Sequence, residues 1–202
     1  LSGGAPLTSI GDMADWIDSL LASLGVAQAT LVGHSQGVLV ALETASRHPE
    51  RVAALTLIAG AMAIPVNDAL IEMSQSAPEK AYRMMTSWGY GPGAHKFDNT
   101  QPGHAFLGYG RRVMAQNDGA ALHADLVACN SYGGGKDAAA SVTQPSLCLL
   151  AGKDKMTPVK FGRKMAEQIS GAQCHVFERA GHFLPAEFPI EVNDAMAAFL
   201  SR

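Results

Sequence analysis

Hydrophobic residues along the chain gather into four short runs, each bounded by polar or glycine-rich segments. A short apolar run with such boundaries is typical of a buried strand. We therefore predict strands at four places: near Thr30 and at 55–59, 147–151 and 174–178. The segments after the first and third runs show helical spacing, so the pattern favours an α/β fold.

Two helices are predicted from periodicity together with start and stop signals. At 10–24 the apolar residues fall on one face of a helix; Ser9, with Asp12 three positions on, can cap its start, and Gly25 marks its end. Pro158 suits a first helical turn, so a second helix is predicted from there to near residue 171.

The most informative motif is the pentapeptide Gly33-His34-Ser35-Gln36-Gly37. It lies between the apolar run at 29–32 and a helical pattern at 38–45. A nucleophile elbow needs this context, because a strand must end abruptly, a strained turn must present the serine hydroxyl, and a helix must start at once. We expect both glycines to be required, since backbone approaches backbone too closely there for a Cβ. The alternative interpretation is an ordinary glycine-rich turn.

A carboxylate and a histidine follow the serine in the order that such chemistry needs. Asp154 comes just after the run at 147–151, and His182 just after 174–178. The carboxyl ends of strands hold the sites of open α/β sheets, so both are candidates; the alternatives are a helix-capping aspartate and a surface histidine. The main rival acid is Asp68, well past its strand end. The remaining histidines suit the role less well: His34, His48, His95, His104, His123 and His175.

Three segments together resemble the α/β-hydrolase family: the serine pentapeptide, the acid loop at 152–158, and Gly181-His182 followed by Glu187 and Pro189. The resemblance implies the α/β-hydrolase fold, a mostly parallel sheet flanked by helices with an inserted helical cap. It implies Ser35 as the nucleophile, His182 as general base and then acid, and Asp154 as the group that orients the imidazole. The backbone N–H of Gln36 would stabilise the oxyanion, and Gly33, His34 and Gly37 would shape the elbow.

The same resemblance divides the chain into a first part of the hydrolase core at 1–60, a helical cap at 61–143 and a second part of the core at 144–202. Within the cap, helical patterns are predicted around 66–76, 78–86, 111–116 and 120–131, with an irregular stretch at 89–110. Most apolar residues there would form only the cap's own core. Met62, Trp88 and Phe106 are candidates to line an apolar acyl or alkyl pocket.

The front of the chain departs from the family pattern. The family's earlier strands, and the loop that supplies a first oxyanion-hole N–H, have no counterpart in this sequence. We therefore expect the chain to be the C-terminal part of a longer hydrolase, in which the strand ending at Val32 forms an exposed apolar edge. The alternative is a minimal hydrolase with a reduced sheet.

Composition narrows the class of protein further. The 202 residues are 48% apolar and 16% charged, which favours a globular domain, and the net charge of −3 without a basic cluster argues against nucleic acid as a partner. No apolar run reaches the roughly 20 residues of a membrane span. Cys129, Cys148 and Cys174 are odd in number, and the last two lie in predicted core strands, which favours a reducing, cytoplasmic setting. The histidines show no zinc-site spacing, so we expect no metal, and the oligomeric state stays open.

The resemblance predicts a serine hydrolase that cleaves a carboxylic ester or related acyl bond of a small, largely apolar substrate. The reaction would pass through an acyl-enzyme on Ser35 and need no cofactor. The same residues would also serve acyl transfer, C–C bond hydrolysis or cofactor-free haloperoxidation. A binding protein without catalytic activity on the same scaffold is the alternative from another class.

Overall fold

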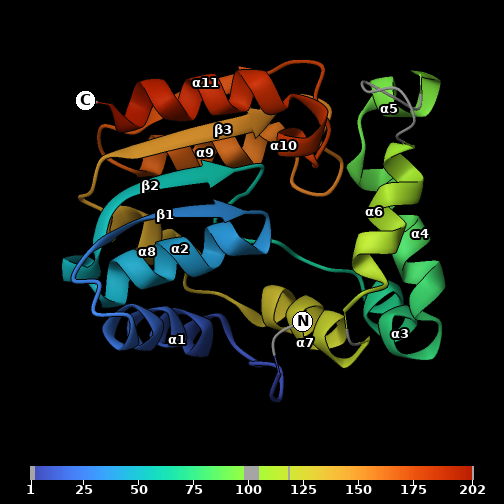
Figure 1. Cartoon of the computed structure of the whole chain (residues 1–202), viewed down its shortest axis with the longest axis horizontal. Coiled ribbons are helices and arrows are strands. Elements are labelled where there is room, and N and C mark those ends of the chain that lie inside the picture. Colours follow the sequence, from blue (N-terminus) through green and yellow to red (C-terminus); the bar gives the residue numbers. More distant parts are fainter. Residues whose placement is uncertain (1–2, 98–104, 118, 202) are drawn as a thin grey trace.

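The fold is built on a parallel sheet, seen in a computed structural model that describes residues 3–97, 105–117 and 119–201 (Figure 1). Its strands are β1 (Ala29–His34), β2 (Val52–Ile58), β3 (Ser146–Ala151) and β4 (Gln173–Phe177). They lie in the order β1-β2-β3-β4, and every neighbouring pair is parallel. The four predicted strands and the α/β class are confirmed.

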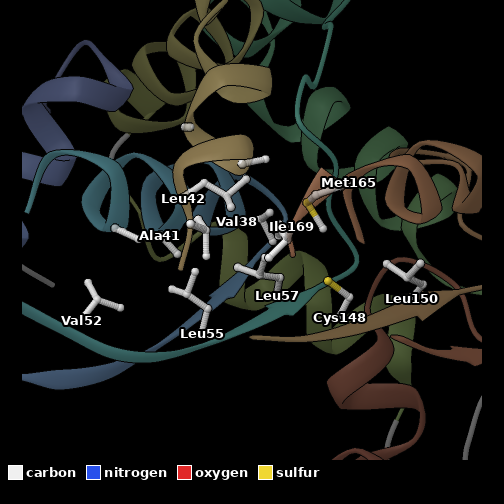
Figure 2. Close-up of a cluster of buried hydrophobic side chains, with 14 residues drawn as sticks. Val38, Ala41, Leu42, Val52, Leu55, Leu57, Cys148, Leu150, Met165 and Ile169 are labelled. Atoms are coloured by element: carbon white, nitrogen blue, oxygen red, sulfur yellow. The ribbon is translucent and has the colours of Figure 1, made fainter. Parts of the chain in front are cut away.

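Helices cover both faces of the sheet. On one face, α2 (Gln36–Arg47), α8 (Gly135–Ser141) and α9 (Val159–Gln168) pack over a hydrophobic cluster shown in Figure 2. On the other face lie α10 (Leu184–Glu187) and α11 (Pro189–Leu200), which share a second cluster. Along β3, Cys148 and Leu150 face the first cluster, whereas Leu147 and Leu149 face the second. A strand buried on both faces favours apolar residues on both, which is why β3 is one continuous apolar run from Leu147 to Ala151.

The helix predicted near the front of the chain is α1 (Ile10–Ser23), which packs against α2. The Ser9 hydroxyl accepts a hydrogen bond of 3.0 Å from the backbone N–H of Asp12, so the predicted N-cap is confirmed. A short 3₁₀ helix, η1 (Pro49–Arg51), leads into β2.

The remaining helices form a group beyond the carboxyl ends of the strands (Figure 1). They are α3 (Asp68–Ser76), α4 (Pro78–Gly89), α5 (Pro92–Phe97), α6 (Phe106–Met114) and α7 (Gly119–Ser131). The helical patterns predicted for this region are therefore confirmed. The irregular stretch predicted at 89–110 is wrong where α5 and α6 form, and its residues 98–104, with His104, lie outside the described residues.

One helix, α8, falls in the range 61–143 yet packs with the sheet. Ala138 and Ala139 are buried in the cluster shared by α2 and α9. Gly135 lies so close to the Met62 carbonyl that a Cβ would overlap it. The division at 60, 61–143 and 144 stays a prediction, but α8 itself belongs to the layer under the sheet.

The two outer strands expose side chains that the inner strands bury. In the described sheet β1 has β2 as its one neighbour, and Val32 is 52% exposed, as expected for an apolar edge. The prediction that Cys174 lies in the core is wrong, because β4 is the opposite outer strand and this thiol is exposed. Cys129 and Cys148 are buried, and all three cysteines are free.

Candidate active site

The turn at Ser35 joins β1 directly to α2. Ser35 has φ 56° and ψ −119°, a backbone conformation that residues other than glycine rarely adopt. Its N–H donates to the Ile58 carbonyl at 3.0 Å, which fixes the turn to the end of β2. A Cβ on Gly33 would overlap the Gly37 carbonyl, whereas a Cβ on Gly37 would meet no atom within 4 Å. The steric requirement expected of both glycines is therefore confirmed for Gly33 and wrong for Gly37.

Asp154 and His182 are joined by a short buried hydrogen bond. His182 Nδ1 lies 2.8 Å from Asp154 Oδ2, and both residues are buried. The other carboxylate oxygen, Oδ1, accepts hydrogen bonds of 2.8 Å from the backbone N–H groups of Met156 and Thr157. The acid loop thus holds the carboxylate in one orientation toward the ring. The rival acid Asp68 is exposed at the start of α3.

Thr157 ties this pair to the sheet. Its hydroxyl lies 2.7 Å from Asp154 Oδ2, 2.7 Å from the Ala59 carbonyl and 3.2 Å from His182 Nδ1. A hydroxyl has one proton to donate, and the carbonyl and the carboxylate oxygen both compete for it. The sequence places Thr157 in the acid loop but indicates no role for it, because the motif does not show that the loop folds back onto the end of β2.

The residue before the serine contacts the histidine loop. His34 Nε2 donates to the His182 carbonyl at 2.7 Å, and the two ring centroids are 4.9 Å apart. Burial, reinforced by electrostatic repulsion from the nearby His182 ring whenever that ring is protonated, lowers the pKa of His34 to about 4, so the His34 ring is neutral at pH 7. The described residues include no hydrogen bond between the Ser35 hydroxyl and the His182 ring; catalytic hydrogen bonds are often long in unliganded enzymes.

Glu187 links the histidine loop to the end of α4. Its Oε2 accepts from the backbone N–H of Gly91 at 3.0 Å, and both carboxylate oxygens lie 3.1 Å from the N–H of Gly181. The His182 N–H donates to the Gly89 carbonyl at 2.6 Å. A Cβ on Gly91 or Gly181 would overlap the facing backbone. We call this contact between residues 89–91 and 181–182 the glycine seam.

Ser35 and Gln36 line a cavity of about 310 Å³ between the elbow, the acid loop and helices α3, α4 and α7. Most of the wall is apolar, but Asp125 and Lys155 bring charges to it that sequence reasoning missed. Trp88 lines the cavity as expected. Met62 and Phe106 do not, because Met62 packs against the sheet's cluster and the Phe106 ring lies 5.4 Å from that of Tyr90.

One group of potential metal ligands occurs among the described residues: Asp18, His48 and Glu50. Asp18 already binds the Arg51 guanidinium at 2.6 Å, and His48 lies 2.9 Å from Asp15. Two of the three side chains, those of Asp18 and His48, are thus engaged with other partners, and we assign the group no metal.

A model of the alpha/beta hydrolase family matches residues 2–195. The chain belongs to the alpha/beta hydrolase family. Its relatives include a 2-hydroxymuconate semialdehyde hydrolase of Pseudomonas sp. (strain CF600), 25% identical, with 92% of this chain and 68% of the relative covered. Another is a pimeloyl-[acyl-carrier protein] methyl ester esterase of Neisseria meningitidis serogroup B (strain H44/76), 27% identical, with 89% and 71% covered.

Solved structures show the same fold as this alpha/beta hydrolase. An enol-lactonase from Burkholderia xenovorans LB400 superposes with a TM-score of 0.89 at 19% identity, over 100% of this chain and 76% of that chain. The family and the named relatives indicate a hydrolase of the α/β type. None of the helices in the described ranges combines the length and the apolar character of a membrane span.

Proposed function

We propose that this alpha/beta hydrolase is a serine hydrolase that cleaves a carboxylic ester or related acyl bond through an acyl-enzyme on Ser35. The observation that carries the proposal is the placement of Ser35. It lies in a strained turn at the wall of a cavity, and its neighbour His34 is bonded to the loop of the Asp154-bound His182. Strain of this kind is typical of functional positions.

The proton path follows from the hydrogen bonds of His182. Because Nδ1 is engaged with Asp154, the ring nitrogen left to receive a proton is Nε2. Ser35 Oγ attacks the carbonyl carbon as its proton passes to Nε2, and the imidazolium is stabilised by the Asp154 carboxylate. The same proton then goes to the leaving alcohol. Water, deprotonated by His182, releases the acid.

The oxyanion would face the start of α2. The backbone N–H of Gln36 lies in the first turn of that helix, where N–H groups have no intrahelical acceptor and the helix dipole favours negative charge. One such donor stabilises the transition state by about 3–4 kcal/mol. The apolar cavity supports a small, largely apolar acyl group, with Trp88 in its wall. The ester named for the Neisseria relative supports the choice of bond.

The test is covalent labelling by a fluorophosphonate, followed by assays on short activated esters. Ser35→Ala should abolish labelling, and Ser35→Ala or His182→Ala should lower turnover by about four to six orders of magnitude without additivity. Asp154→Asn should cost less, because the ring keeps its place but can take the wrong tautomer. His175→Ala is the matched control, since His175 is exposed on β4. A folded chain that stays unlabelled would favour a binding protein instead.

A further inference from the structure

The cavity beside Ser35 contains a carboxylate that the proposed chemistry does not use. Asp125 belongs to α7, and it is one of two charged residues in the described wall. Gln36 Nε2 donates to the Asp125 carbonyl at 3.1 Å and lies 3.4 Å from Asp125 Oδ1. Asp125 is thereby held against the residue that follows the nucleophile.

Most of the acceptor capacity of this carboxylate is unused. Oδ1 has one long hydrogen bond to Gln36, and Oδ2 has no hydrogen-bond or ion-pair partner among the described residues. A carboxylate can accept about four hydrogen bonds. Its surroundings on α7 are apolar, with Leu122 and Leu126 in the same wall. Burial raises the pKa of Asp125, and the Gln36 hydrogen bond opposes that rise only in part.

An acceptor left open beside an apolar cavity discriminates among ligands. A hydrogen bond from the ligand would restore the solvation that Asp125 loses when the cavity is filled, whereas a purely apolar ligand would leave the carboxylate dry and unpaired. We propose that Asp125 is a specificity residue that selects acyl groups carrying a hydroxyl over apolar acyl groups of the same shape. This inference rests on the proposed function, because it places the acyl group in the cavity at Ser35.

A hydroxyl fits the cavity better than a cation does. Lys155 lines the same cavity, so the described wall has one positive and one negative residue and offers no net negative charge to a cation. Lys155 also supplies the rival explanation, since its ammonium can donate to the oxygen of a hydroxyl. A second rival is that Asp125 only ties α7 to the elbow through Gln36, in which case it would affect all ligands alike.

The experiment measures binding without turnover. The Ser35→Ala protein would be titrated by NMR with pairs of methyl esters. Each pair comprises a hydroxyalkanoate and the alkanoate in which a methyl group replaces its hydroxyl. The position of the hydroxyl moves stepwise along the acyl chain from one pair to the next. For at least one position the hydroxyl ester should bind about ten- to a hundredfold more tightly. Adding Asp125→Leu should abolish that ratio. Adding Asp125→Asn, which keeps an acceptor oxygen and the tie to Gln36, should retain part of it.

Lys155→Met is the matched control and should leave the ratio unchanged. The inference is overturned if no hydroxyl position is preferred, if neither ester of any pair binds, if Asp125→Leu weakens both esters equally, or if Lys155→Met abolishes the preference. Labelling of Ser35 is scored separately on the unsubstituted chain. Preference without labelling would refute the proposed function alone, and labelling without preference would refute this inference alone.

Discussion

Glu187 provides the sharpest test of how the histidine loop is held. We predict that Glu187→Ala destabilises the fold far more than Glu187→Gln does. The carboxylate accepts hydrogen bonds from the N–H groups of Gly91 and Gly181, at 3.0 and 3.1 Å, and it is buried. In the alanine variant both N–H groups would remain buried without an acceptor.

The magnitude follows from those two groups. A buried donor without a partner costs about 1–3 kcal/mol, so two of them cost about 2–6 kcal/mol. Removing a buried carboxylate recovers part of that cost, since burial is the main cause that raises the pKa of Glu187. We therefore expect Glu187→Ala to lower the free energy of unfolding by about 2–4 kcal/mol. An amide oxygen in place of Oε2 would accept hydrogen bonds from both N–H groups, so Glu187→Gln should change the free energy of unfolding by less than about 1 kcal/mol.

The difference between the parent and the glutamine variant should depend on pH. Because the pKa of Glu187 is raised in the folded state, the folded chain binds more protons than the unfolded chain between the two pKa values. The stability contributed by this group is fully present below the unfolded value and is lost as the pH rises through the folded value. Glutamine does not titrate, so the free energy of unfolding of the Glu187→Gln variant should rise relative to that of the parent as the pH is raised from about 4 to about 7.

The assay is urea unfolding of the parent and both variants at each pH, with the slope against urea checked for constancy. The reasoning about the glycine seam fails if alanine costs less than about 1 kcal/mol or if glutamine costs as much as alanine. A glutamine variant that loses stability relative to the parent as the pH rises would contradict the sign of the pKa shift.

Two further predictions concern the elbow. Gly33→Ala should destabilise the fold by about 1–3 kcal/mol or more and suppress Ser35 labelling, because the new Cβ overlaps the Gly37 carbonyl. Gly37→Ala has open space around its Cβ in α2, so it should leave stability unchanged or raise it by up to about 1 kcal/mol. Urea unfolding measures both variants, and equal effects would contradict this difference. His34 should titrate by NMR with a pKa of about 4, so its contribution to stability is present at neutral pH and lost as the pH falls through that value; an ordinary pKa near 6.5 would show that the ring is not buried against His182.

The sheet was predictable because its signal is local. In β3 the residues that face α9 and those that face α11 alternate along one run, and since both faces are covered every position from Leu147 to Ala151 is apolar. The turn at Ser35 was equally readable, since β1, the strained residue and α2 are contiguous. The roles of Ser35, Asp154 and His182 stay predictions until they are tested.

The cavity wall was not predictable in the same way. Asp125 meets Gln36 across 89 positions of sequence, and the pattern of α7 does not say which of its faces meets the elbow. The prediction for Met62 and Phe106 rests on the type of their side chains alone. Met62 packs instead against the hydrophobic cluster of the sheet, and the Phe106 ring lies beside that of Tyr90. The apolar side chains of helix α8 are all alanines, so its burial depends on the space left between α2 and α9 rather than on a pattern of large hydrophobic residues.

The glycine seam has a consequence for how such a protein can change its specificity. Trp88, in the wall of the cavity, stands next to Gly89, whose carbonyl holds the backbone of His182. The last turn of α4 is thus hydrogen-bonded directly to the backbone of the candidate general base, so the two should move together. Variation in α3 and α7 can reshape the cavity without moving the end of α4, whereas an exchange of helices that cuts at residues 89–91 would also shift His182. Grafts between relatives should therefore keep this tripeptide from the recipient and join the donor segments on either side of it.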